Sequence, residues 1–582
     1  MPILSKEFLS KGAILLAIGL LTVTIIHFGF SKSKRPSVLS IDPDNNSEGV
    51  GETTSLSTII LKLPNGKING TTITAQTVFL TEDKSGAVVP SQAFGTNGGA
   101  TIKLVPSQKL KLSTTYKFTI TNGVKDVSGA SFVSYTSKFT TVALPTSNIE
   151  GIGFDKIDLP NATGQHSTLT IGPDKKLYAL SIDGMIKRFA INSDGTLATP
   201  DSLYSLQDAY GTRQQRLAIG LTFDPASTPD NLIAWVTHSS FMFLNGPPWD
   251  GKLTRLSGRN LQHAEDVLIN LPRSARDHLT NSIAFGADGA LYFTQGSITA
   301  MGGADHIWGN RNECLLSAAV LRLDVSKLKY LPLNVKTIDG GGAYDPYAAN
   351  APLTIYASGL RNAYDLVWHS NGNLYVPTNG SNAGGNTPAS VKGTLRSDKS
   401  MYNGPVIHAL NNVQESQKDF LFRVVRGGYY GHPNPLRGEY VMNGGNPTTA
   451  KDPAEVKDYP TGTLPDINYR GYSFDFQCYK SPNGVIEYKS NTFNSALKGK
   501  LLVVRYSQND DIITLTPGGS NNDIISSIGG LSIEGFSGFK DPLDLTEDLE
   551  TGNIYVSEYG GEGQIVLLRV KKNVSELSKI KP

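Results

Sequence analysis

Four stretches of similar pattern decide the fold: LTIGPDKKLYAL (169–180), IAFGADGALYFT (283–294), LVWHSNGNLYVP (366–377) and LTEDLETGNIYVS (545–557). In each, an apolar segment leads into a polar turn, and a short strand with Leu-Tyr or Ile-Tyr follows. Two divergent copies cover residues 219–236 and 499–515. Short repeated strands separated by turns are typical of radial β-sheets, because each sheet buries its faces only against its neighbours. We therefore predict a six-bladed β-propeller over residues 150–572.

A second all-β region precedes the repeats, over residues 36–145. Its short segments alternate apolar and polar residues, as in TTITAQTVFL (71–80), ATIKLVP (100–106), TTYKFTITNGV (114–124) and SFVSYTSKFTT (131–141). About seven such strands in roughly 100 residues are typical of a β-sandwich. The opening Pro36-Ser37-Val38 and the closing Phe139-Thr140-Thr141 resemble the bacterial Ig-like domains of surface-layer and adhesin proteins. That resemblance implies a spacer or a weak adhesion unit.

The N-terminus carries a long apolar segment. Residues 12–30, GAILLAIGLLTVTIIHFGF, are flanked by Lys and Arg on both sides. A helix of that length rises roughly 28 Å, enough for a hydrocarbon core of about 30 Å. Cleavable signals have shorter apolar regions, about 7–15 residues. We predict an uncleaved signal anchor over residues 1–35, with the later domains facing the periplasm or the cell exterior, and a polar tail over 573–582.

Composition excludes several classes of protein. The 582 residues carry a formal net charge of +2, so the chain lacks the basic footprint of a nucleic-acid-binding protein. Two cysteines, Cys314 and Cys478, are too few for a disulfide scaffold or a Cys-rich zinc site. The 60 Gly and 31 Pro suit a turn-rich all-β chain.

Polar residues border the repeat strands, where a propeller brings loops to one end of its channel. They are Gln215, Asp277, His278, Arg361, Asn362, the segment 379–382 and the Gly-rich loop 426–433. A histidine beside a guanidinium, a carboxamide and backbone carbonyls could remove a proton, stabilise negative charge and hold a hard cation. Taken singly, each residue fits a structural role as well, since Arg361 and Asn362 could bridge two blades and the glycines could form a tight turn.

The order of these motifs resembles that of the soluble glucose/sorbosone dehydrogenases, six-bladed propeller quinoproteins that use pyrroloquinoline quinone (PQQ) and calcium. The resemblance covers roughly residues 155–570. Four motifs carry it, namely QRLAIGLTFDP (215–225), RDH (276–278) with GADG (286–289), GLRN (359–362) and GGYYGHPN (427–434).

The resemblance implies roles for individual residues. His278, next to Asp277, would be the base that takes the proton of the sugar hydroxyl, and Arg361 would stabilise the developing oxyanion. Gln215 and Asn362 would position substrate and cofactor. Further residues follow from the same resemblance: the backbone carbonyls of Gly380 and Ser381 as calcium ligands, and Arg505 and Lys540 as cations for the cofactor carboxylates.

This chain departs from the family at several positions. Ser297 stands where the family has an Asp that orients the catalytic histidine, and a hydroxyl stabilises an imidazolium less than a carboxylate does. His432 replaces a Trp, while Phe474 and Gln477 stand where glucose oxidisers carry aromatic residues that contact the sugar. The inserted Asp305-His306 is a candidate to compensate for the missing carboxylate.

Two functions remain open. The first is a membrane-anchored PQQ-dependent dehydrogenase that oxidises an aldose-type sugar or related alcohol and passes electrons to a cytochrome or a membrane quinone. The alternative is a catalytically degenerate propeller that binds carbohydrate or protein at the cell surface. A calcium-dependent hydrolase of the lactonase kind is less favoured, because few carboxylates lie at the predicted blade ends.

Overall fold

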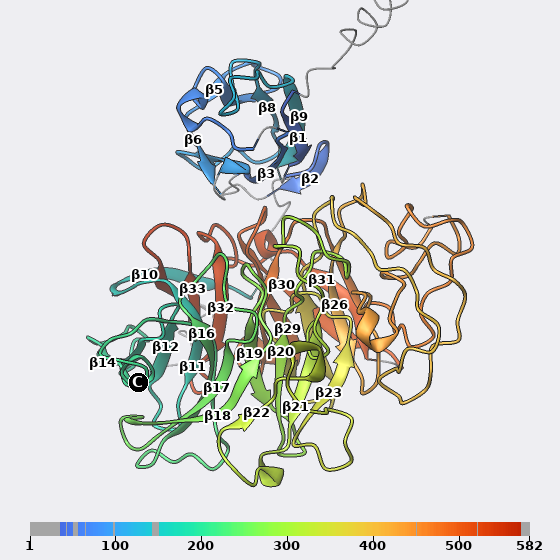
Figure 1. The fold of residues 1–582 in the computed structure, drawn as a ribbon. Helices are drawn as coiled ribbons and strands as arrows, with labels where there is room; N and C mark the ends of the chain where they lie inside the picture. Colours follow the sequence, from blue (N-terminus) through green and yellow to red (C-terminus); the bar gives the residue numbers. More distant parts are fainter. Residues whose placement is uncertain are drawn as a thin grey trace, which may run out of the picture. The chain divides into compact units, whose positions relative to one another are not determined.

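The structure is a computed structural model that describes residues 35–41, 43–50, 56–64, 66–96, 99–141, 151–449, 451–520 and 522–571 (Figure 1). The predicted signal anchor, except Arg35, and the polar tail lie outside the described residues. Within the described ranges, no helix combines the length and the apolar character that crossing a membrane requires.

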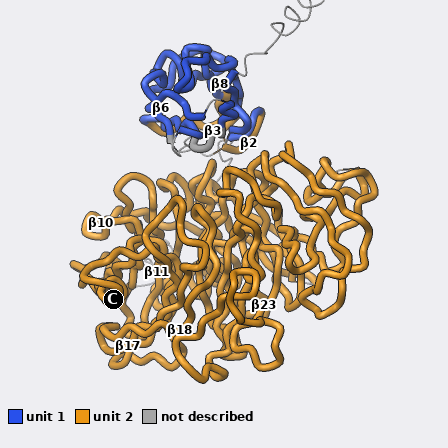
Figure 2. Tube along the Cα trace, in the orientation of Figure 1, with its two compact units in different colours: residues 1–45, 56–107, 116–138 blue, residues 46–55, 108–115, 139–582 orange. Residues whose placement is uncertain are grey.

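The chain divides into two compact units, which Figure 2 colours separately. The first takes in the described parts of residues 1–45, 56–107 and 116–138, and the second those of residues 46–55, 108–115 and 139–582.

The N-terminal strands form two sheets, as an Ig-like sandwich requires. One has the order β1-β3-β7-β6 and the other β2-β9-β8-β4-β5. The strands are β1 (Ser37–Ser40), β2 (Ser47–Val50), β3 (Leu56–Lys62), β4 (Val78–Glu82), β5 (Val88–Val89), β6 (Ser91–Thr96), β7 (Thr101–Pro106), β8 (Thr115–Ile120) and β9 (Tyr135–Thr141). In β8, Tyr116, Phe118 and Ile120 are buried and the residues between them are not, so the alternation read from the sequence is that of a half-buried strand.

One strand is shorter than its sequence pattern predicts. The alternation predicts a strand over 71–80, but the strand begins at Val78, and η1 (Gly70–Thr72) forms a 3₁₀ turn before it. The side chain of Asn69 accepts a hydrogen bond from the Thr71 amide at 3.2 Å and so caps this turn. A local side-chain bond of this kind competes with sheet pairing.

The described part of the chain after residue 150 forms six sheets, one after another. Their strands are β11 (His166–Ile171), β12 (Leu177–Ser181), β13 (Ile186–Phe189) and β14 (Asp201–Leu203); β15 (Arg216–Phe223), β16 (Ile233–Ser240), β17 (Gly251–Ser257), β18 (His263–Leu271) and β22 (Leu333–Asn334); β19 (Thr280–Phe285), β20 (Leu291–Gln295), β21 (Ala319–Leu323) and β23 (Leu353–Ser358); β24 (Val367–Trp368), β25 (Leu374–Thr378), β26 (Asp419–Val424) and β27 (Phe474–Gln477); β28 (Pro482–Tyr488), β29 (Lys500–Arg505), β30 (Asp511–Gly518) and β31 (Asp523–Ile528); and β32 (Pro542–Glu547), β33 (Ile554–Glu558), β34 (Gln564–Val570) and β10 (Phe154–Thr163).

Helical structure in the described part of this region is confined to short turns. These are α2 (Ser205–Asp208), η3 (Val325–Lys327), η4 (Ile338–Gly340), η5 (Pro435–Arg437), η6 (Phe493–Ser495) and η7 (Gly530–Ser532).

The six sheets are arranged in a closed ring. The first strand of each sheet contacts the first strand of the next, in the order β11, β15, β19, β24, β28 and β32, and β32 contacts β11 again. The last sheet combines strands from both ends of this region, because β10 pairs with β34. This is a propeller-like arrangement, in which apolar side chains of neighbouring sheets form the core.

The repeated Leu-Tyr pattern has a structural cause. The hydroxyl of Tyr178 donates to Asp174 at 3.0 Å, and that of Tyr292 donates to Asp288 at 3.0 Å. In the third copy, Asn371 donates to the hydroxyl of Tyr375 at 3.0 Å. In each case the tyrosine is four residues after its partner in the turn. The aromatic ring therefore packs in the core while its hydroxyl forms a hydrogen bond that stabilises the turn.

Candidate functional site

His278 lies two residues before β19, and Ser297 lies two residues after the neighbouring strand β20. The Nδ1 atom of His278 is 3.1 Å from the Ser297 carbonyl oxygen and 3.0 Å from its hydroxyl oxygen. That hydroxyl donates its own proton to the Thr299 carbonyl at 2.8 Å. Both Ser297 oxygens can therefore only accept, so Nδ1 carries the proton and Nε2 presents its lone pair.

His278 is only 3% exposed. Burial holds the pKa of the imidazole well below its usual range, and the nearby charge of Arg361 lowers it further. The ring is therefore neutral at physiological pH, which is the protonation state that a base needs.

Arg361 lies close to His278. Its Nε donates to the Ala300 carbonyl at 2.9 Å and its Nη1 to the Gly380 carbonyl at 2.6 Å. The Ser297 amide donates to the Arg361 carbonyl at 2.7 Å, which joins the two segments. Burial lowers the pKa of the guanidinium to about 10, although the carboxylates of Asp277 and Asp419 oppose the shift. Arg361 remains charged at neutral pH.

Trp308 covers this pair, and the sequence motifs did not point to it. The indole ring centroid is 4.3 Å from that of His278, and the guanidinium of Arg361 is 5.5 Å from the indole. Arg276 lies over the same ring at 5.6 Å. The Trp308 amide donates to Asp305 at 3.0 Å, so the inserted Asp305-His306 segment holds the tryptophan. Asp305 is buried and His306 is exposed.

A buried histidine–glutamate pair lies beside the candidate base. His432 Nε2 is 3.0 Å from Glu313 Oε1, and both side chains are almost fully buried. Glu313 also accepts from the Thr299 amide at 2.9 Å. Burial alone would raise the pKa of Glu313, but the charge that His432 carries when protonated and these hydrogen bonds hold it at about 2. Burial also lowers the pKa of His432 itself. His432 also lowers the pKa of His278 through its charge, so the two imidazoles belong to one electrostatic cluster.

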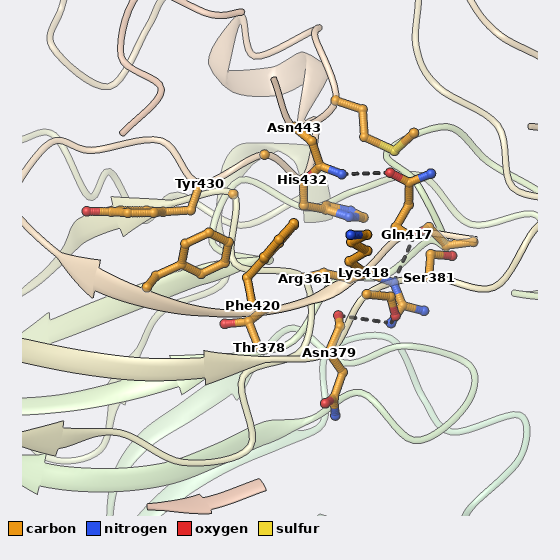
Figure 3. Close-up of a pocket in the computed structure, with 16 residues that line it drawn as sticks. Arg361, Thr378, Asn379, Ser381, Gln417, Lys418, Phe420, Tyr430, His432 and Asn443 are labelled. Carbon is orange, nitrogen blue, oxygen red and sulfur yellow. Dashed lines mark hydrogen bonds between the residues drawn. The ribbon is translucent and has the colours of Figure 1, made fainter. Parts of the chain in front are cut away.

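A small pocket opens at Arg361. Its volume is about 30 Å³, room for about one water. Besides Arg361 and Asn443, the residues labelled in Figure 3 come from the end of β25 and the residues after it, from the 417–420 segment at the start of β26, and from the Gly-rich loop. Asn443 donates to Gln417 at 2.7 Å across the pocket. His432 lines it but His278 does not, so a substrate reaches Nε2 only if a covering side chain moves.

The remaining predicted residues lie in different surroundings. Asp277 and Gln215 are exposed, and Lys540 is exposed with its amide bonded to Glu558 at 2.9 Å. The side chain of Asn362 accepts from Asn281 at 3.1 Å. Arg505 forms a two-pronged ion pair with Asp511, at 2.7 and 2.6 Å.

The two predicted calcium ligands are also bonded within the protein. The Gly380 carbonyl accepts from Arg361, and the Ser381 carbonyl accepts from the Gln417 amide at 2.7 Å. Within the described ranges, no three His, Cys, Asp or Glu side chains cluster as a metal site would require.

These contacts test the fit of the predicted cofactor. A PQQ molecule carries three carboxylates, which require free cations, and its calcium requires free carbonyls. Arg505 is neutralised by Asp511, and each of the two carbonyls already has a donor. The residues fit proton removal by His278 next to Arg361, whereas the paired Arg505 and the bonded Gly380 and Ser381 carbonyls would have to change partners before they could hold PQQ and calcium.

Comparison with known proteins adds two findings. Residues 32–141 match a family described as the bacterial Ig-like domain, in agreement with the resemblance seen in the sequence. No curated protein matches the chain.

Solved structures of several descriptions are similar to this one at low identity, and three of them are described as dehydrogenases or as a domain of one. A structure described as a "putative oxidoreductase (glucose dehydrogenase)" of Thermus thermophilus is 19% identical, with 72% of this chain and 100% of that chain covered and a TM-score of 0.44. The PQQ-bound aldose sugar dehydrogenase of Streptomyces coelicolor is 15% identical, with 72% and 98% covered and a TM-score of 0.44. The holo PQQ domain of pyranose dehydrogenase from Coprinopsis cinerea is 12% identical, with 73% and 98% covered and a TM-score of 0.45. At these values the structures assign neither activity nor cofactor to this chain.

Proposed function

We propose that the six sheets are the six blades of a sugar oxidoreductase, carried outside the cytoplasm on an Ig-like domain and a membrane anchor. One observation carries the proposal: His278 is held as the neutral tautomer with its proton on Nδ1, beside a half-buried, charged arginine. That combination is suited to removing a proton from a hydroxyl group.

The chain's own residues account for proton removal. Nε2 of His278 accepts the proton of the substrate hydroxyl, and the Ser297 oxygens stabilise the resulting imidazolium through Nδ1. Arg361 stabilises the negative charge that develops on the substrate oxygen, because a fixed cation in a buried site acts strongly on nearby charge. Trp308 has to move aside first, since its ring lies against His278.

Oxidation also requires an electron acceptor. PQQ with calcium, followed by a respiratory cytochrome or membrane quinone, is the acceptor system that the sequence resemblance predicts. We propose this acceptor system, and the membrane anchor, as predictions separate from proton removal. Binding of PQQ and calcium would first require the predicted calcium ligands and Arg505 to release their present partners.

The test is dye-linked oxidation of a panel of aldoses by the full chain, with and without PQQ and calcium. We expect activity to fall by about 10²–10⁴-fold in His278→Ala, the range for loss of a general base. The matched control is His263→Ala, which changes an exposed histidine at the start of β18. Oxidation at equal rates by His278→Ala and the wild type would refute the role of His278.

A second candidate function is a carbohydrate- or protein-binding module. The bonded state of Gly380, Ser381 and Arg505 favours it, because a protein that does not bind the cofactor has no need to keep these groups free. Thermal denaturation distinguishes the two. A cofactor that binds the folded state raises the melting temperature. Saturating PQQ with calcium should therefore raise the melting temperature of a PQQ-dependent enzyme and leave that of a binding module unchanged.

A further inference from the structure

A second, larger cavity lies apart from the His278 cluster. Its volume is about 340 Å³, within the size range of pockets that bind small molecules. It is bordered by β23, by the loops 346–349 and 396–399, and by the first residues of the Gly-rich loop. The Gly-rich loop separates the two pockets, since Gly427 and Gly428 line this cavity whereas Tyr430 and Gly431 line the one at Arg361.

The residues that line the cavity include more cations than carboxylates. Six of its lining residues carry a positive charge and two carry a negative charge, a formal excess of four; they are Arg322, Lys327, Arg396, Lys399, Arg426 and Arg437 against Asp398 and Glu439. Four of these cations pair with carboxylates and serve the fold. Arg437 is bonded to Glu439 at 2.9 Å and Arg322 to Asp288 at 2.8 Å. Lys327 lies 3.8 Å from Asp324, and Arg396 is bonded to Asp466.

Two further cations, Lys399 and Arg426, lie at the rim of the cavity. Both are exposed, and among the residues that the structure describes neither side chain forms an ion pair. Their charge is therefore available to a ligand.

Arg396, one of the residues that line this cavity, has a buried hydrogen-bond donor without a partner among the described residues. Arg396 is 4% exposed, and its guanidinium is bonded to Asp466 and to the Gly438 carbonyl. Its Nε atom, however, has no hydrogen-bond partner in the described structure. Leaving a buried N–H of a charged group unpaired is costly, and a ligand acceptor that reached Nε after a small shift of the lining would remove that cost.

Hydroxyl groups and aromatic rings complete the lining. The hydroxyls of Tyr347 and Ser397 lie close enough to interact, but within the described part of the chain neither makes a well-oriented hydrogen bond. Tyr356 adds a second aromatic ring. Free hydroxyls and aromatic rings suit a ligand that has both hydroxyl groups and apolar C–H faces.

We propose that this cavity binds a sugar that carries a negative charge, as a phosphate or a carboxylate. The rim cations and Arg396 recognise the anionic group, and Tyr347, Ser397 and Tyr356 contact the hydroxylated ring. The site is independent of the oxidoreductase proposal, because its lining includes neither His278 nor Arg361.

The test is calorimetric titration of the full chain with glucose 6-phosphate, glucuronate, neutral glucose and inorganic phosphate. We expect both charged sugars to bind, and the one with the higher affinity shows which anionic group the cavity prefers. The affinity for neutral glucose should be lower by about tenfold or more. Equal binding of glucose, or no binding of either charged sugar at millimolar concentration, overturns the proposal. Inorganic phosphate that binds as tightly as the sugar phosphate overturns the sugar-binding part.

Variants locate the site. The double change Lys399→Ala with Arg426→Ala should weaken the charged sugars about tenfold or more, and Ser397→Ala should weaken them with little effect on inorganic phosphate. Lys392→Ala, an exposed lysine outside the cavity, is the matched control. His278→Ala should leave this binding unchanged. Loss of binding in His278→Ala but not in the rim variant would place the ligand at the other pocket and overturn the proposal.

Discussion

At the scale of single residues, the candidate base depends on a serine. Ser297 orients His278 with two neutral oxygens, whereas a carboxylate would also supply a negative charge. A neutral acceptor fixes the tautomer equally well but does little to stabilise the protonated ring.

Burial and the charge of Arg361 therefore determine the pKa of His278. The cluster favours the neutral imidazole more strongly than a His-carboxylate pair would.

Ser297→Asp should raise the pKa of His278, because the added carboxylate stabilises the imidazolium. NMR titration of histidine ring signals, assigned with His278→Ala, measures this pKa. In the wild type, the pKa of His278 is lower in the folded than in the unfolded chain. Below pH 6.5 the unfolded chain therefore binds a proton that the folded chain does not bind, and the free energy of unfolding falls as the pH drops. The Ser297→Asp variant should show a smaller fall. Ser297→Asn, with similar shape and no charge, is the control. An unchanged pKa in Ser297→Asp would contradict this account.

At the scale of elements, the end of β23 and the Gly-rich loop position the site together. The Ser358 amide donates to Gly428 at 3.0 Å, and the His432 amide donates to Gly359 at 2.9 Å. This pairing places Arg361, two residues after Gly359, next to His432. Gly359 has a φ of +80°, and a Cβ atom there would lie 2.6 Å from the Tyr429 ring. The backbone can approach the loop this closely only because residue 359 has no side chain.

Gly359→Ala should therefore destabilise the protein by more than its backbone strain alone, which is about 1 kcal/mol. The control is Gly372→Ala, at a φ of +81° with no atom within 4 Å of the added Cβ, where only the strain applies. Denaturant unfolding of both variants measures the difference. Equal losses of stability would show that the loop can shift at no cost.

At the scale of the whole molecule, the ring of sheets is closed by its first strand. Strand β10 pairs with β34, so that one sheet joins residues separated by the entire ring. Phe154 anchors this closure: it is 1% exposed, and its ring lies 5.1 Å from those of both Phe493 and Phe536. Pairing of β34 with β10 also covers a sheet edge that would otherwise be open to other chains.

Phe154→Ala should cost about 3–5 kcal/mol of folding free energy, the usual range for a buried Phe. The change leaves a cavity at the point where the last sheet closes the ring of sheets. Phe243→Ala is the control, since Phe243 is 44% exposed and its loss should cost little. Chemical denaturation monitored by intrinsic fluorescence gives both values. A similar small loss in the two variants would mean that the ring does not depend on this contact.

The sequence by itself determined the all-β architecture, the Ig-like region and the position of the repeats, because these depend on local patterns: alternation along β8, and tyrosines placed four residues after polar turn residues. It also indicated His278 and Arg361, which belong to short motifs. Only the tertiary structure decided which groups are already bonded. Arg505 meets Asp511, Arg361 meets Gly380, and Trp308 covers His278 through contacts between segments that are separate in the chain. Burial and pairing set the charge and the availability of each group, and neither can be read from residue type and spacing alone.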